Sequence, residues 1–213
     1  NLDVCSLNSN RSKLAMSLIF ELGINEYIFP QNLKENALIN LNGDCSYERY
    51  ASLFLNVPIE VRKNTIDEFF NMMGGHKKLV KDVLQLAMEF DCVPKEKNKL
   101  VWYIIQNKNI LKGILTLKSS GTAEQREDAD RINKMFNYMH EIKIPMSLKE
   151  LPLDGTDLKN MGLHGRHISE ALDGLWKEYI QNENFHKKGL TRQKIRSMAM
   201  EYVRIRYKES LEE

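Results

Sequence analysis

The stretch MGLHGRHISEAL, residues 161–172, contains two glycines three positions apart, followed by apolar residues at helical spacing. Gly162 can end a helix, because glycine adopts the left-handed C-cap conformation without a steric penalty from a Cβ atom. Leu163 is then the apolar residue of the turn, and Gly165 allows the backbone to approach closely. A second helix is predicted over 166–181. The stretch therefore predicts two helices joined by a tight turn.

Two interpretations of this turn remain open. Backbone N–H groups and a helix N-terminus attract phosphate oxygens, and Arg166 stands where a guanidinium could pair with a phosphate. The alternative is a plain linker, because cations at a helix N-terminus mildly oppose the helix dipole. The residues of the turn alone favour the linker. Gly155 and Asp157 belong to the short first helix, so the helix-hairpin-helix-like region covers 155–181.

The rest of the chain also has helical periodicity, and alternating strand patterns are missing. We predict an all-α fold without a sheet. The loop-like stretch SSGTAEQ at 119–125 suggests a boundary between a helical body domain, 1–118, and a helical tail domain, 119–213. The spacing of Ser147 and Glu150 predicts a capping box.

Positive charge is concentrated near the end of the chain. Between positions 185 and 208 there are eight Lys or Arg residues and one acid, Glu201, although the whole chain carries a net charge of only +2. Such asymmetry points to a polyanionic partner. An ordinary solvated helix face remains the alternative. The candidate phosphate contacts are Arg166, Lys187, Lys188, Arg192, Lys194 and Arg196, and the predicted core-facing stripe is Ile195, Met198, Tyr202 and Ile205.

A second basic stretch, GGHKKLVKD at 74–82, supplies weaker candidates for phosphate contact. Its cations are Lys77, Lys78 and Lys81. The stretch lacks the Gly-Lys-Ser/Thr ending of a P-loop, so nucleoside-triphosphate binding is not expected there. A solvated first turn of a helix is the favoured interpretation.

Catalytic and metal-binding patterns are missing from the sequence. There is no HExxH motif, and Cys5, Cys45 and Cys92 lie too far apart for zinc spacing. His164 and His167 have no third ligand nearby. No carboxylate pair stands beside a glycine turn, as two-metal nucleotidyl transfer would need. We therefore expect no catalytic and no metal-ligating residue in this chain.

The segment LPLDGTDLKNMGLHGRHISEALDGLWKEYIQNEN, 151–184, resembles the C-terminal region of bacterial class II tRNA nucleotidyltransferases, the CCA-adding enzymes, and of their poly(A) polymerase relatives. That family carries a Gly-x-Asp-Leu start, a turn between two glycines, a nearby Ile or Val, a long helix and an Asn-Glu ending. The stretch 14–30 is similar to a helix of the family's body domain. The family often has Pro-Gly in the turn, where this chain has His164-Gly165. The matching residues are Gly155, Asp157, Leu158, Gly162, Gly165, Ile168, Asn182 and Glu183.

The resemblance implies the body and tail of a CCA-adding enzyme, without its catalytic head. The chain starts at Asn1 and not at Met, so we expect a piece of a longer protein. The body would support the tRNA acceptor stem and the tail would reach toward the elbow. Mg²⁺ with CTP and ATP would serve the missing head, and the chain alone would be inactive. No apolar run reaches 18 residues, so we expect no membrane partner and a cytoplasmic location. The alternatives are a poly(A) polymerase, or a helical protein-interaction module that does not bind RNA.

Overall fold

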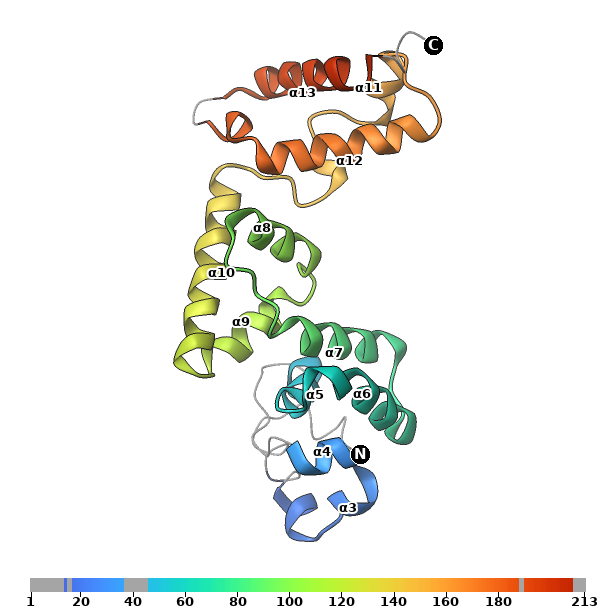
Figure 1. Cartoon of the computed structure of the whole chain (residues 1–213), viewed down its shortest axis with the longest axis vertical. Coiled ribbons are helices and arrows are strands. Elements are labelled where there is room, and N and C mark those ends of the chain that lie inside the picture. Colours follow the sequence, from blue (N-terminus) through green and yellow to red (C-terminus); the bar gives the residue numbers. More distant parts are fainter. Residues whose placement is uncertain (1–13, 15–16, 37–45, 188–189, 209–213) are drawn as a thin grey trace. The chain divides into compact units, whose positions relative to one another are not determined.

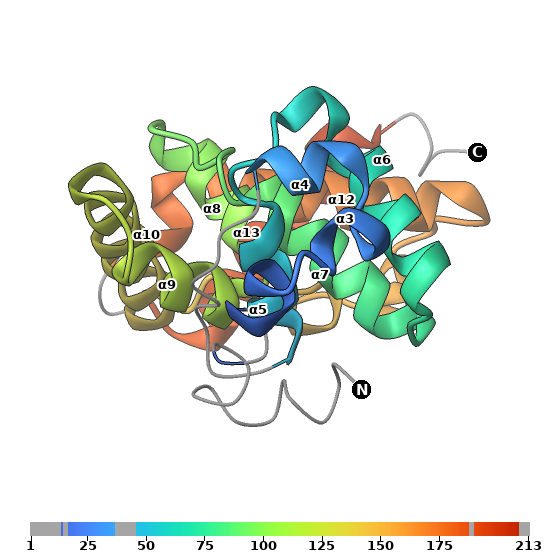
Figure 2. The same ribbon diagram turned by 90° about the horizontal axis from the view of Figure 1, so that it is seen from below.

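The computed structural model describes residues 14, 17–36, 46–187 and 190–208. Throughout these residues the regular elements are helices, and none of the described residues lies in a strand (Figure 1; Figure 2). The prediction of an all-α fold is therefore confirmed. Among the described helices, none has both the length and the apolar character needed to cross a bilayer.

The chain divides into two compact units. The N-terminal unit comprises Asn1–Lys95 and Gln106–Asn133, and the C-terminal unit comprises Glu96–Ile105 and Lys134–Glu213. In the N-terminal unit the helices are α3 (Asn25–Ile28), α4 (Gln31–Asn36), α5 (Ser46–Phe54), α6 (Ile59–Met73), α7 (Lys77–Glu89) and α9 (Leu111–Ser119). The C-terminal unit contains α8 (Lys97–Gln106), η1 (Leu148–Glu150), α11 (Gly155–Asn160), α12 (Arg166–Gln181), η2 (Glu183–His186) and α13 (Arg192–Arg206). Helix α10 (Ala123–Glu141) begins in the first unit and ends in the second.

The core of the N-terminal unit is built around Phe69 of α6. Its fully buried ring lies 5.5 Å from the ring of Phe54 and 5.9 Å from that of Phe29, between ring centroids. Tyr50 and Phe70 complete the cluster at 6.3 and 5.3 Å. Edge-to-face and tilted ring pairs of this kind add stabilisation beyond burial. Aromatic packing thus joins α5 and α6 to the segment before α4.

The predicted boundary at 119 differs from the observed division. Residues 119–122 form a tight corner between α9 and α10, where the Thr122 N–H donates to Gln125 Oε1 at 2.9 Å and the Gln125 N–H donates to Thr122 Oγ1 at 3.3 Å. This reciprocal pair is a capping box. On the two sides of the corner, the buried Lys118 ammonium lies 2.9 Å from Asp128 Oδ2. The loop-like composition of this stretch therefore reflects helix capping.

Helix α8 belongs to the C-terminal unit although it precedes the predicted boundary. The rings of Trp102 in α8 and Trp176 in α12 form a T-shaped pair with centroids 5.0 Å apart. The indole N–H of Trp176 donates to the Pro145 carbonyl at 2.9 Å. Both tryptophans are half-buried, and these two contacts lie within the C-terminal unit. A pairing of residues 74 positions apart cannot be read from local composition.

The capping box predicted for Ser147 and Glu150 does not form. The Ser147 hydroxyl instead donates to Glu150 Oε1 at 2.9 Å, and the Met146 N–H donates to Glu150 Oε2 at 2.9 Å. The element is one turn of 3₁₀ helix, which Pro152 follows after one residue. A proline restricts the preceding residue to extended conformations, so a longer helix cannot begin here.

Candidate nucleic-acid interface

The hairpin begins with a capping box at the N-terminus of α11. Asp154 Oδ1 accepts hydrogen bonds from the N–H groups of Thr156 at 2.8 Å and Asp157 at 2.9 Å. Asp157 Oδ2 in turn accepts from the Asp154 N–H at 3.1 Å. Gly155 is the first helical residue, and Asp154 and Asp157 form the two halves of the capping box. The start of the hairpin is therefore held by its own side chains.

Helix α11 ends in a Schellman motif at Gly162. This glycine has a φ of 105° and donates its N–H to the Lys159 carbonyl at 2.9 Å. The Leu163 N–H donates to the Leu158 carbonyl at 3.0 Å, and both leucines are fully buried. These two hydrogen bonds and the leucine contact are the features of that C-cap. The prediction that Gly162 adopts the left-handed C-cap conformation is confirmed, and Leu163, the apolar residue of the turn, is buried.

Helix α12 starts after Gly165, which has a φ of 54° and a ψ of −129°. No side chain caps this N-terminus. Arg166 is exposed, and His167 Nδ1 lies 3.4 Å from Glu170 Oε2 one turn further on. The hairpin is explained by packing and capping alone, as the linker interpretation expected. Phosphate binding at Arg166 stays a prediction.

The rotation of α13 differs from the predicted one. Its fully buried residues are Ala199 and Val203, whereas Ile205 of the predicted stripe is 74% exposed. Gly174 of α12 leaves room for two tyrosine side chains, because an added Cβ there would lie 2.8 Å from the Tyr207 hydroxyl oxygen and 3.3 Å from that of Tyr202. The helix turns Ala199 and Val203 inward and leaves Ile205 outside. The predicted core position of Ile205 is wrong, while Ile195, Met198 and Tyr202 are half-buried.

Arg196 is engaged inside the unit. Its guanidinium forms an ion pair with Asp157 and donates to the Pro152 carbonyl at 3.2 Å. The hydrogen bond from the Asp154 N–H holds the pKa of the Asp157 carboxyl below its ordinary value, and Arg196 lowers this pKa further. This arginine therefore joins α13 to α11. Its role as a phosphate contact stays a prediction.

Two of the predicted cations lie around one surface groove. Lys187 and Lys194 are exposed and line a depression of about 370 Å³ between η2 and α13, which we call the α13 groove. Among the described residues, neither ammonium group makes an ion pair or hydrogen bond. Two carboxylates also line the groove, Glu178 and Glu201. Its apolar lining is Phe185, Leu190, Met198, Tyr202 and Ile205.

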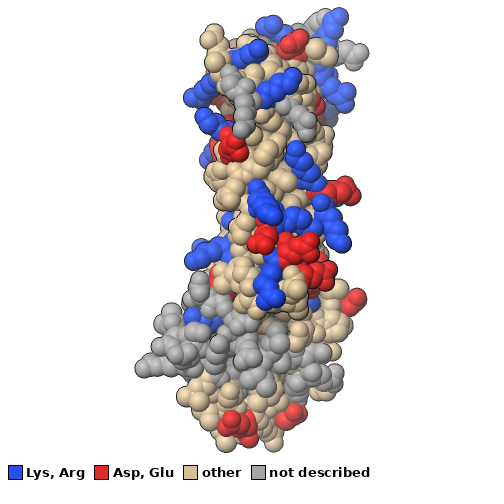
Figure 3. Space-filling model, turned by 90° about the vertical axis from the view of Figure 1, so that its left-hand side faces the viewer, with Lys and Arg blue, Asp and Glu red and all other residues tan. Residues whose placement is uncertain are grey.

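The remaining predicted contacts are distributed differently. Arg192 is exposed in the first turn of α13, after the N-cap Thr191, whose Oγ1 accepts from the Lys194 N–H at 3.2 Å. Lys188 lies outside the described residues. In Figure 3 the C-terminal unit is at the top of the view, and blue Lys and Arg side chains predominate over red acidic ones on its visible surface.

The weaker basic candidates belong to the N-terminal unit. Lys77, Lys78 and Lys81 are exposed in the first turns of α7. The two glycines before them have a structural cause, because Gly74 caps α6 with a φ of 73° and a Cβ on Gly75 would lie 2.8 Å from the Phe70 ring. Nothing in this turn requires a phosphate. These lysines are in a different compact unit from the α13 groove, so they are not assigned to the same site.

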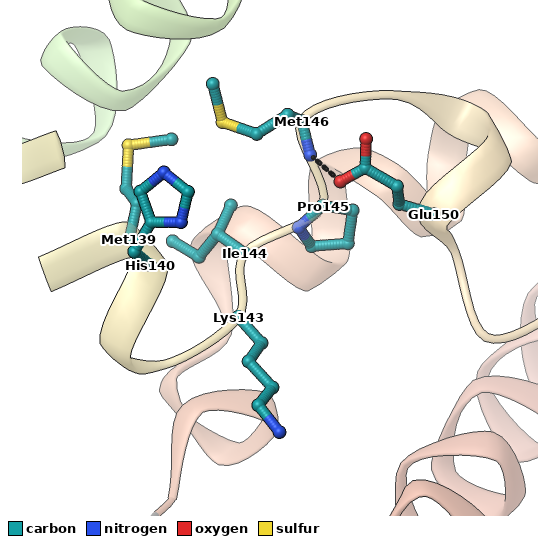
Figure 4. A pocket seen from close by; sticks show the side chains of 7 residues that line it. All are labelled: Met139, His140, Lys143, Ile144, Pro145, Met146 and Glu150. Carbon is teal, nitrogen blue, oxygen red and sulfur yellow. Dashed lines mark hydrogen bonds between the residues drawn. The ribbon is translucent and has the colours of Figure 1, made fainter. Parts of the chain in front are cut away.

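A pocket of about 290 Å³ near the end of α10 was not predicted from sequence. Figure 4 shows His140, Met139 and Met146 on one side of it and Glu150 on the other. Both carboxylate oxygens of Glu150 accept hydrogen bonds, one from the Met146 N–H and the other from the Ser147 hydroxyl. Within the described residues, no three His, Cys, Asp or Glu side chains are grouped as a metal site. The pocket therefore offers no acid–base pair or metal centre among these residues.

Comparison with known proteins does not add a relative to this picture. No protein-family model, curated protein or solved structure matches the chain.

Proposed function

We propose that the C-terminal unit binds the sugar–phosphate backbone of folded RNA, and that this RNA is tRNA. The observation that supports the proposal is the α13 groove, where Lys187 and Lys194 stand exposed and unpaired among the described residues. Arg192, exposed at the first position of α13, is a third cation of the same segment. Structured RNA is recognised mainly by shape and through its phosphates and 2′-hydroxyls, which flexible surface lysines and arginines suit.

The charge balance of the segment supports a polyanionic ligand. Asp157 neutralises Arg196, but the acids that line the α13 groove do not pair with Lys187 or Lys194 in the structure. A bound phosphate would pair with these two lysine ammonium groups. Each phosphate that a cation neutralises releases condensed counterions, so affinity should fall steeply as salt rises.

The finer proposal is that the chain is the body and tail of a CCA-adding tRNA nucleotidyltransferase. Its support is the sequence pattern of 151–184, including the Gly155, Asp157, Gly162 and Gly165 positions. In that case Mg²⁺, CTP and ATP serve a catalytic head outside this chain. A poly(A) polymerase would need the same RNA-binding region, and nucleotide incorporation by the full-length parent separates the two activities.

A titration with tRNA at two salt concentrations tests RNA binding directly. We expect the Kd to rise by about 10-fold or more between 50 and 200 mM salt if several phosphates are contacted. The double variant Lys187→Glu with Lys194→Glu should weaken binding strongly. The matched control, Lys149→Glu with Lys159→Glu, reverses the same charge at exposed positions of the same unit that do not line the groove. An equal loss of tRNA affinity in the two double variants would show that the α13 groove is not the binding site. Absence of tRNA binding at 50 mM salt would reject RNA binding altogether.

One observation favours a second candidate function, docking of a protein. Ile205 is 74% exposed at the rim of the α13 groove, beside the apolar lining from Phe185 and Met198. Exposed apolar side chains around a groove are typical of protein interaction surfaces. Ile205→Ser should leave tRNA affinity unchanged if the ligand is RNA backbone. The protein-interaction module is the better description if tRNA does not bind and a protein partner does. In that case binding of the partner should be insensitive to salt and should be abolished by Ile205→Ser.

A further inference from the structure

Lys143 has a backbone conformation that glycine usually supplies. Its φ is 56°, and among the described residues it is the only non-glycine with a positive φ. It follows the last turn of α10, where its N–H donates to the His140 carbonyl at 3.3 Å and the Ile144 N–H donates to the Met139 carbonyl at 2.9 Å. Helix α10 therefore ends in a Schellman motif with lysine at the position where such motifs prefer glycine.

Comparison with α11 shows that the lysine strains the backbone at this position. Gly162 occupies the same position in the Schellman motif of α11, with a φ of 105°. A residue with a Cβ atom is strained in the left-handed region, and glycine is not. Strained residues persist where the rest of the structure holds them, and they concentrate at functional sites. A lysine at a position that favours glycine therefore suggests that its side chain has a function of its own.

Lys143 is among the residues that line the pocket at the end of α10, but its side chain extends away from the others. In Figure 4 it points away from His140, Met146 and Glu150, on the opposite side of the backbone. It lines a second depression of about 340 Å³, which we call the Lys143 groove. The Lys143 ammonium makes no ion pair or hydrogen bond with the described residues. An unpaired cation on a strained backbone thus faces an open groove.

Lys187 connects this groove with the proposed RNA surface. It lines both the Lys143 groove and the α13 groove. His186 also lines the Lys143 groove, but its Nε2 lies 2.6 Å from the Tyr179 carbonyl oxygen, so that nitrogen is occupied within the unit. Glu141 is the one carboxylate among the lining residues. Two lysines against one carboxylate leave the groove with a positive balance.

We propose that Lys143 and Lys187 together bind a backbone phosphate of the RNA, in the Lys143 groove. This inference rests on the proposed function and adds Lys143 to the binding residues. The Lys143 groove and the α13 groove then form two phosphate positions that share Lys187. Lysine binds a phosphate as a flexible point charge and needs no fixed fork geometry, so an arginine at position 143 can replace it.

The test uses Lys143→Gly, because this change removes the cation and the backbone strain together. We expect Tm to stay constant or to rise by about 1–3 °C, since glycine accepts the left-handed conformation. Affinity for tRNA should nevertheless fall by about 3- to 10-fold, and the salt dependence should lose about one phosphate contact. Lys143→Arg should retain affinity. Lys149→Gly, which removes one charge from an exposed position of the same unit, should bind like the parent.

The outcomes separate the two proposals. If the parent chain binds tRNA in a salt-sensitive way and Lys143→Gly binds equally well, the inference about Lys143 is overturned while RNA binding stands. If the parent chain does not bind tRNA at low salt, the proposed function itself fails. Inorganic phosphate at constant ionic strength should not displace the tRNA. Displacement that is lost in Lys143→Gly would identify free phosphate as the ligand and overturn the RNA assignment.

Discussion

Arg196 of α13 and Asp157 of α11 form an ion pair across 39 positions of sequence, and the same guanidinium donates to the Pro152 carbonyl at 3.2 Å. Asp157 also closes the capping box of α11 through the Asp154 N–H. One carboxylate therefore both begins a helix and holds another helix against it. One of the arginines of the basic segment therefore already has a carboxylate partner within the unit.

Arg196→Gln should lower stability and Arg192→Gln should lower tRNA affinity, although the two changes remove the same charge one turn apart. Arg196→Gln breaks the contact with Asp157, so we expect a loss of about 1 kcal/mol in the free energy of unfolding, the size typical of a partly exposed charged pair. Arg192→Gln should leave stability unchanged and weaken tRNA binding. Urea unfolding and tRNA titration of both variants check this. Equal loss of affinity in the two would show that Arg196 leaves Asp157 when RNA binds.

The pH dependence of stability should reveal Asp157. Hydrogen bonding from Asp154, followed by Arg196, lowers its pKa in the folded state below the ordinary value of 3.8. The ionised carboxylate therefore stabilises the fold above that value, and this contribution is lost as the pH falls through the lower, folded pKa. Asp157→Asn should be less stable than the parent at pH 7, with the difference shrinking toward pH 3. A difference that stays constant across this range would contradict the assignment.

Gly165→Ala should destabilise the C-terminal unit. The φ of 54° and ψ of −129° at Gly165 are essentially restricted to glycine, and an added Cβ would have nothing within 4 Å, so the effect isolates backbone strain. We expect a loss of about 1–3 kcal/mol in the free energy of unfolding. Gly155→Ala is the control, because the Cβ there would make an ordinary contact of 3.5 Å with Ile168. Thermal unfolding of both variants measures the difference.

Asp128→Asn should destabilise the N-terminal unit more than Lys118→Met does. The Lys118 side chain is only 3% exposed, with its ammonium 2.9 Å from Asp128 and 4.5 Å from the centre of the Phe90 ring. Removal of the carboxylate leaves a buried charge without its counter-ion and should cost about 3 kcal/mol. Methionine at position 118 removes the charge and retains most of the apolar stem. Glu127→Gln, at an exposed position of the same helix, controls for the lost negative charge.

Local sequence was sufficient for much of the helical layout. Helix α12 spans 166–181 as predicted, and the turn before it has left-handed glycines at Gly162 and Gly165. These features depend on periodicity, capping and glycine conformation, which act within a few residues. Lys143 shows the limit of such rules, since its left-handed conformation carries no glycine signal.

The sequence by itself determined that this chain is helical, where its hairpin turns and that positive charge gathers near its end. Only the tertiary structure decided which of these cations remain without a partner among the described residues and which form contacts within the protein. Arg196 and Lys194 are two residues apart on one helix, yet the first pairs with Asp157 and the second lines a groove. The rotation of α13 separates them, and in that rotation Ala199 and Val203 are buried in the core of the unit. The sequence gives the number and order of the charges, whereas the packing of the helices determines the surroundings of each one.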